Sequence, residues 1–227
     1  MDLLRLLEDP DGYARRLASV MDRAGAAGHD AVDGTAGLAL AAFARLFGPG
    51  SPAIATDCKP GCSWCCRMMV TATAAEVLAL AAAIDALPPD GAAAIRTRVS
   101  AAVPAVTGLD QDARRRLARP CPLLEADGRC GVYEARPLAC RGLESFDAGA
   151  CRAAMEGREV EVPLSATHLK AEAAVAAALS AGLAARDRSA TRYELVRALA
   201  IALTRPDARA AWLAGGDPFA PAAVAVS

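Results

Sequence analysis

The chain has 227 residues, of which 54% are hydrophobic, so it can bury a sizeable core, and we predict a single domain over residues 1–227. Its 25 Lys and Arg and 26 Asp and Glu give a net charge of −1, which excludes a globally basic nucleic-acid-binding protein and a polyacidic tail protein. Aromatic residues are only 4%, while alanine is abundant, and this favours closely packed helices over aromatic-rich sheets.

The apolar pattern indicates neither a membrane span nor a secretory signal. The longest charge-free apolar stretch in the C-terminal half covers residues 173–185, which is shorter than the roughly 20 residues that a span needs. The N-terminus places Asp2, Glu8 and Asp9 among its leucines, whereas a signal has a basic start and an unbroken apolar run. We therefore expect a cytoplasmic protein, whose thiols stay reduced or bind metal.

Apolar residues at helical spacing predict several helices in the first half of the chain. One covers about 36–47. A second covers about 73–87, and it opens with a capping box in which the Thr73 hydroxyl and the Glu76 carboxylate bind each other's backbone N–H groups. A third follows over about 95–103.

The second half alternates between loop and helix. Prolines and glycines punctuate residues 119–142, so we expect a loop there. Helices are predicted over 175–183 and, after a second capping box at 191–194, over 196–203. The tail, 217–227, is expected to be poorly ordered. Because no segment alternates as a strand does, we predict an all-α fold, a helical bundle with two cysteine-rich metal-binding loops at one end.

Eight cysteines fall into two groups. The first group is C-x3-C-x2-C-C within CKPGCSWCC, and the second follows after 54 residues without cysteine; the eight are Cys58, Cys62, Cys65, Cys66, Cys121, Cys130, Cys140 and Cys151. A disulfide scaffold is the alternative, but such scaffolds carry about 8–10% cysteine and belong to oxidising compartments. Short spacings let a turn direct two sulfurs at one centre, and thiolates select zinc, copper(I) or iron–sulfur clusters. We predict that the two groups converge around metal.

The adjacent pair Cys65–Cys66 points to more than one metal atom. Neighbouring side chains diverge in a helix or a strand, so the two sulfurs reach a single ion only with strain. Either two zinc or iron ions, or one iron–sulfur cluster with spare cysteines, would use the available thiolates. Cys151 follows a predicted N-cap at 145–147, and a helix N-terminus favours thiolate. Ligation and simple packing are equally compatible with Cys151.

Arginines accompany both cysteine groups and would offset thiolate charge. Arg67 follows the first group, while Arg129, Arg136 and Arg141 lie within the second. For Arg136 and Arg141, contact with the cluster and a solvent-facing salt bridge are both open.

The remaining candidate residues have ordinary interpretations. Trp64 is expected to shield the cluster from water, and the basic run 114–116 with Arg119 is expected to be a solvated face. His29 and His168 lie away from the cysteines and are expected to be helix-end or surface residues.

The cysteine segments resemble one known family. C-x3-C-x2-C-C from Cys58, followed by C-P-L-L-x5-C-G-V-Y-E-A-R-P-L-A-C-R from Cys121, is similar to the YkgJ-type cysteine-cluster family, described as a zinc- or iron-chelating domain. The resemblance covers about 55–155, between N- and C-terminal helices. It implies a zinc or iron cofactor, with a [4Fe-4S] cluster as one form, held by Cys58, Cys62, Cys65, Cys66, Cys121, Cys130 and Cys140. Extending the ligand set to Cys151 is our own inference.

Three functions follow from this pattern. The first is a cytosolic metal-binding protein whose partners are metal ions, with no membrane and no nucleic acid. The second is an Fe–S- or metal-dependent protein-modifying or redox enzyme; a similar cysteine pattern occurs in flagellin lysine methylases, and such an enzyme needs an open coordination position. The third is an interaction module that zinc stabilises without catalysis. The sequence leaves open whether the protein is an enzyme.

Overall fold

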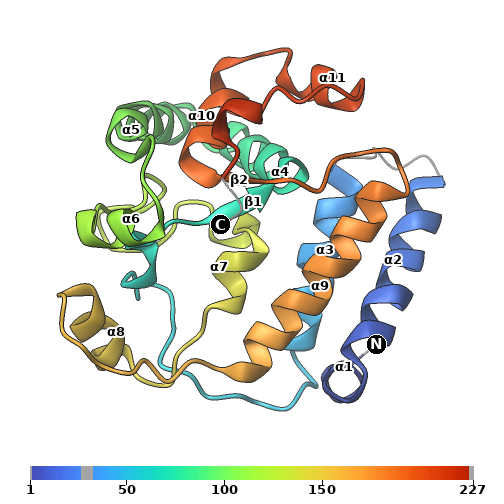
Figure 1. The fold of residues 1–227 in the computed structure, drawn as a ribbon, viewed down its shortest axis with the longest axis horizontal. Helices are drawn as coiled ribbons and strands as arrows, with labels where there is room; N and C mark the ends of the chain where they lie inside the picture. Colours follow the sequence, from blue (N-terminus) through green and yellow to red (C-terminus); the bar gives the residue numbers. More distant parts are fainter. Residues whose placement is uncertain (1, 27–32, 225–227) are drawn as a thin grey trace.

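The structure is a computed structural model that describes residues 2–26 and 33–224, and it is mostly helical (Figure 1), which confirms the mainly helical prediction. The helices are α1 (Leu3–Glu8), α2 (Pro10–Ala26), α3 (Asp33–Leu46), α4 (Ala74–Asp85), α5 (Pro89–Val106), α6 (Gln111–Leu117), α7 (Leu138–Gly142), α8 (Ala148–Met155), α9 (Ala166–Ala184), α10 (Leu195–Thr204) and α11 (Ala208–Leu213). Two strands, β1 (Thr71–Thr73) and β2 (Arg192–Glu194), and three single 3-10 turns, η1 (Cys65–Arg67), η2 (Tyr133–Ala135) and η3 (Ala220–Ala222), complete the described elements.

The helices form two groups that share one apolar core. In the first, α9 packs against α2, α3 and α7; in the second, α10 packs against α4 and α5. Contacts between α3 and α4 join the groups, and one buried apolar cluster runs from α1 to η3. The cysteine segments lie beside α7 and α6 between the groups (Figure 1), rather than at one end of a single bundle. No helix in the described part of the chain is both long and apolar enough to cross a membrane.

Helix α9 shows why alanine dominates this fold. Ser165 caps it by accepting from the His168 N–H, and its buried face carries small residues such as Ala171 and Ala178. Small side chains let helices approach closely. At Gly182, a Cβ atom would lie 3.4 Å from Met21 on α2, so glycine there allows tight contact between the two helices.

A two-stranded antiparallel ribbon, which the sequence did not indicate, connects the groups. Thr71 pairs with Glu194 and Thr73 with Arg192. The capping box predicted at 191–194 is therefore wrong: the segment is extended, and Glu194 itself caps α10 by accepting from two backbone N–H groups. Pairing with a distant strand overrides the local pattern. The capping box at Thr73 is confirmed.

Two further expectations fail because tertiary packing supplies order. The segment 119–142 is not all loop, since it contains η2 and α7. The tail is packed rather than poorly ordered over 217–224, because Phe219 is fully buried and its ring lies 5.6 Å from that of Tyr193; residues 225–227 lie outside the described residues.

His168 is at a helix end, as expected, but it is buried and its ring stacks on that of Phe47, with 3.9 Å between the ring centroids. His29 lies outside the described residues.

Candidate metal centre

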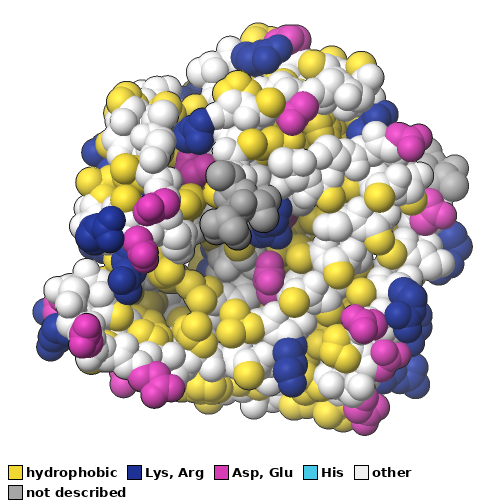
Figure 2. All heavy atoms as spheres, in the orientation of Figure 1, with side chains coloured by type: hydrophobic (Ala, Val, Ile, Leu, Met, Phe, Trp, Pro, Cys, Tyr) yellow, Lys and Arg dark blue, Asp and Glu magenta, His cyan; other side chains and the backbone are white. Residues whose placement is uncertain are grey.

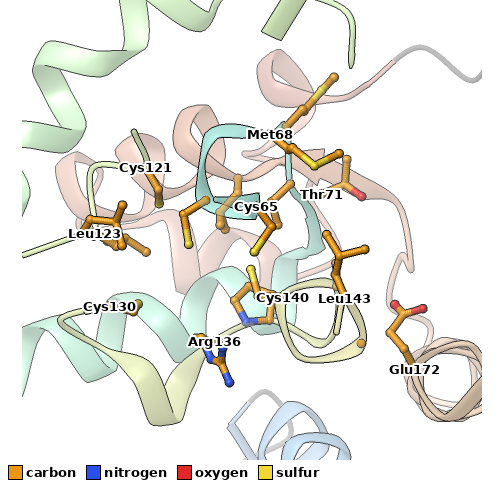
Figure 3. A pocket seen from close by; sticks show the side chains of 18 of the residues that line it. Cys65, Met68, Thr71, Cys121, Leu123, Cys130, Arg136, Cys140, Leu143 and Glu172 are labelled. Carbon is orange, nitrogen blue, oxygen red and sulfur yellow. The ribbon is translucent and has the colours of Figure 1, made fainter. Parts of the chain in front are cut away.

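The two cysteine groups meet around one cavity of about 420 Å³. Figure 3 shows Cys65 from the first group facing Cys121 and Cys140 from the second, with Cys130 nearby. Seven of the eight predicted residues line the cavity: Cys58, Cys62, Cys65, Cys66, Cys121, Cys130 and Cys140. Segments far apart in sequence therefore converge in space, as the spacing predicts. That these sulfurs are metal ligands remains a prediction.

Backbone contacts hold the first group against the second. The Cys121 N–H donates to the Cys66 carbonyl at 2.8 Å, which joins the two groups directly. At the other end of the first group, the Ser145 N–H donates to the Cys58 sulfur at 3.3 Å. The Asp57 N–H donates to the Ser145 carbonyl at 2.9 Å. The first group is thus fastened at both of its ends.

A tight hairpin presents Cys121 and Cys130 from adjacent backbones. Leu124 and Cys130 form an antiparallel bridge, and the Gly131 N–H donates to the Leu123 carbonyl at 2.8 Å. The hairpin turns at Gly128, whose φ of +78° suits glycine, and a Cβ there would lie only 3.2 Å from the Gly61 carbonyl. Glycine at 128 therefore lets the second cysteine loop lie directly on the first.

Several backbone N–H groups point at the sulfurs. Cys121 accepts from the backbone of Leu123, and Cys130 accepts from the backbone of Val132. Each bond lowers the pKa of its thiol, because a donor stabilises the charged form. This repeated turn, in which a sulfur accepts from the backbone two residues later, suits a thiolate ligand.

Burial opposes ionisation of the same thiols in the metal-free protein. It raises the pKa of Cys58 to about 12 and that of Cys121 to about 11, and it also raises the pKa of Cys140. A hydrogen bond with Cys66, followed by burial, raises the pKa of Cys65. A bound metal cation would reverse this balance, since its charge stabilises thiolates. The donor chemistry therefore fits a metal ion that soft sulfur ligands prefer.

The seven sulfurs line one cavity without forming a coordination shell. Within residues 2–26 and 33–224, no three Cys, His, Asp or Glu side chains stand in an arrangement ready to hold a metal ion. All eight cysteines are free and partly exposed.

Arg136 is the cation most closely associated with the cysteines. It lines the cavity, and its charge lowers the pKa of Cys65, Cys130 and Cys140. Its guanidinium stacks on the Tyr133 ring, 3.6 Å from the ring centroid, and its Nε donates to the Tyr133 carbonyl.

The other predicted arginines have different surroundings. Arg141 binds the backbone of the same segment, since its Nε donates to the Arg136 carbonyl at 2.8 Å. Arg67 donates to the Ala118 carbonyl at 3.0 Å, whereas Arg129 is exposed and pairs with Asp127.

Cys151 does not line the cavity with the other seven cysteines. Asp147 caps α8 as predicted, but Cys151 is not among the residues that line the cavity. Helix α8 packs against η1, where the guanidinium groups of Arg67 and Arg152 each lie 5.8 Å from the Trp64 ring. Trp64 therefore packs near two arginines, and it does not line the cavity either.

Sequence reasoning missed two residues that organise the site. Glu76 was assigned only to its capping box, yet its second oxygen accepts from the Leu138 N–H at the start of α7, which carries Cys140. Arg114 was assigned to a solvated face, but it is only 2% exposed, while its neighbours Arg115 and Arg116 are exposed. A pattern of one buried arginine among exposed ones has no clear signature in a single sequence.

Comparison with known proteins finds one family model that matches the cysteine-bearing region. Residues 57–158 match the family model CxxCxxCC, described as "Putative zinc- or iron-chelating domain", which confirms the resemblance. No curated protein and no solved structure matches this chain.

Proposed function

We propose that this chain, whose residues 57–158 match the model of a zinc- or iron-chelating domain, binds metal through the cysteines around the cavity. The observation that carries the proposal is the meeting of seven thiols from two distant segments, with backbone N–H groups directed at three of their sulfurs. The proposed ligands are Cys58, Cys62, Cys65, Cys66, Cys121, Cys130 and Cys140. Because Cys151 lies outside the cavity lining, we give it no ligand role.

The number of thiols favours more than one metal atom. Seven thiolates exceed the four that one zinc ion takes, so two zinc or iron ions, or a [4Fe-4S] cluster with spare cysteines, would use them better. When bound, the metal would supply Lewis acidity or, as a cluster, electron transfer. Arg136 would offset the negative charge of the thiolates from its position on Tyr133.

Elemental analysis of anaerobically purified protein tests the proposal. Zinc predicts a colourless protein with at least one equivalent of metal per chain, whereas an iron–sulfur cluster predicts a brown protein with bound iron and sulfide. A metal content near zero for both elements, after anaerobic purification from cells grown with zinc and iron, would refute the proposal.

We also propose a reducing compartment, such as the cytoplasm, because thiols that bind metal must stay reduced. The structure holds all eight cysteines as free thiols. Thiol counting under denaturing, non-reducing conditions should find all eight in freshly purified protein, and a lower count would support the disulfide alternative.

Access to the cavity favours the enzyme alternative over the interaction module. The face in Figure 2 is hollowed near its centre, and hydrophobic side chains gather along the lower side of the hollow. The cavity that the cysteines line is also lined by apolar groups such as Met68, Leu143 and Leu169, which leaves room beside the sulfurs for a second molecule. A protein-modifying or redox enzyme needs this access, whereas a purely structural zinc site is closed.

Exogenous ligands distinguish the two alternatives. Azide, cyanide or a small thiol should change the absorption spectrum of the iron-loaded or cobalt-substituted protein if a coordination position is open. A spectrum that none of these ligands changes would favour the interaction module.

A further inference from the structure

Arg114 is a buried cation beside the cysteine segments. It lies on α6 and is 2% exposed. Burying a guanidinium costs free energy unless hydrogen bonds or an opposite charge compensate it. Glu194 is the carboxylate that raises the pKa of Arg114 most, but both oxygens of Glu194 already cap α10. The hydrogen bonds of the Arg114 guanidinium go to backbone carbonyls.

The contacts of Arg114 span both cysteine segments. One terminal nitrogen donates to the Arg67 carbonyl at 3.1 Å and to the Arg119 carbonyl at 2.8 Å. Arg67 directly follows Cys66, and Arg119 lies two residues before Cys121. One side chain thus reaches the end of the first cysteine segment and the start of the second.

Arg67 completes this link in the opposite direction. Its guanidinium donates to the Ala118 carbonyl at 3.0 Å, next to Arg119. Between these side-chain bonds, the Cys121 N–H donates to the Cys66 carbonyl at 2.8 Å. Arg114 therefore binds the backbone that follows Cys66, and Arg67 binds the backbone that precedes Cys121. The backbone hydrogen bond between Cys66 and Cys121 joins the same two segments.

One donor of Arg114 has nothing to bind. Its Nε is buried and has no hydrogen-bond partner, and the same is true of the Arg67 Nε. An unpaired buried donor is destabilising, so a fold retains one where another interaction compensates. Arg114 lines the cavity and is coupled electrostatically to Cys121, whose thiolate would supply the missing negative charge.

We propose that Arg114 is a positioning residue of the metal centre, which fixes Cys66 and Cys121 relative to each other and offsets the charge of the bound thiolates. This inference rests on the proposed metal-binding function. It adds a residue outside the cysteine motifs to the requirements of the site, and it assigns a role to one arginine of a run that otherwise faces solvent.

Zinc affinity and a cobalt spectrum test the proposal. The variants are Arg114→Gln, which removes the charge, and Arg114→Lys, which keeps it, with Arg115→Gln on the same helix as the matched exposed control. Zinc affinity is measured on metal-free protein by competition with a chelator. The intensity of the thiolate-to-cobalt charge-transfer band in cobalt-substituted protein reports how many thiolates bind. The unfolding free energy of each metal-free protein under reducing conditions is measured in parallel.

We expect Arg114→Gln to weaken zinc binding by about tenfold or more, since charge-assisted hydrogen bonds of this kind are lost. Its charge-transfer band should weaken as well. Arg114→Lys should recover part of the affinity, and Arg115→Gln should match wild type.

Two results would overturn the role of Arg114. One is unchanged affinity and an unchanged band in Arg114→Gln. The other is a loss of affinity no larger than the destabilisation of its metal-free fold, with no recovery in Arg114→Lys. Failure of the wild-type protein to bind zinc, iron or cobalt would instead refute the proposed function itself.

Discussion

The substitution Glu76→Gln tests whether a buried carboxylate positions the helix that carries Cys140. Glu76 is 1% exposed. Its Oε2 accepts from the Thr73 N–H at 2.8 Å and from the Thr73 hydroxyl at 2.9 Å, and its Oε1 accepts from the Leu138 N–H at 2.9 Å. Because α7 begins at Leu138, one side chain joins the N-terminus of α4 to that of α7.

The expected loss of unfolding free energy follows from the number of hydrogen-bond acceptors that the side chain at position 76 offers. Glutamine keeps one carbonyl oxygen, so it can serve either Thr73 or Leu138, and its amide donor faces a second donor at the other position. A hydrogen bond to a charged group contributes about 1.5–3 kcal/mol to stability. The hydrogen bonds that the glutamine variant retains join neutral groups and are therefore weaker. We therefore expect Glu76→Gln to lower the unfolding free energy by about 3 kcal/mol and the Tm by about 6–12 °C for a chain of this size.

Urea unfolding of the metal-free protein, followed by far-UV circular dichroism under reducing conditions, measures this effect. The control is Glu161→Gln, an exposed carboxylate that should change stability by no more than about 0.5 kcal/mol. If Glu76→Gln unfolds within about 0.5 kcal/mol of wild type, the bridge between α4 and α7 does not have the energetic role assigned to it. The variant should also retain less metal, because α7 carries Cys140.

Three further predictions concern the cysteines and the buried histidine. Cys62→Ser should lower the metal content of purified protein, whereas Cys151→Ser should be milder because Cys151 lies outside the cavity lining; elemental analysis that finds equal losses would contradict the site as described. Zinc added to metal-free protein in weak buffer should release protons, since the pKa values of Cys58 and Cys121 are raised to about 12 and about 11, and an indicator dye that records no acidification would argue against thiolate ligation. Burial lowers the pKa of His168 below its usual value near 6.5, so the unfolded chain binds the extra proton and stability should fall as the pH drops below about 6.5. His168→Gln should lose less stability than wild type between pH 7.5 and pH 5.5 in urea unfolding, and parallel losses would show that His168 does not cause the slope.

The sequence alone predicted the features that depend on local chemistry. Apolar spacing located α3, α4 and α10 to within a few residues, because a helix buries one face at a fixed period. It found α9 as well, but the structure begins that helix at Ala166, well before the predicted start at 175. The capping box at Thr73 was correct, since both of its partners lie within four residues. Cysteine spacing likewise predicted two groups that meet, because thiols at such short intervals suit a shared metal.

Features that depend on distant partners required the tertiary structure. Residues 191–194 match the sequence pattern of a capping box, yet 192–194 form a strand because β1 pairs with them. The tail resembles a disordered end, yet Phe219 fills a space beside Tyr193. Cys151 has the same chemistry as the other cysteines, and only the path of α8 places it outside the cavity lining.

The positions of Arg114 and Glu76 show the same division most clearly. A single sequence records which residues are charged, but the free energy of a charge depends on the groups that surround it after folding. The sequence therefore determined which thiols are available as donors. The tertiary structure decided which cysteines share the cavity and which buried charges hold their segments in place, because those contacts join residues that are 47 and 62 positions apart in the chain.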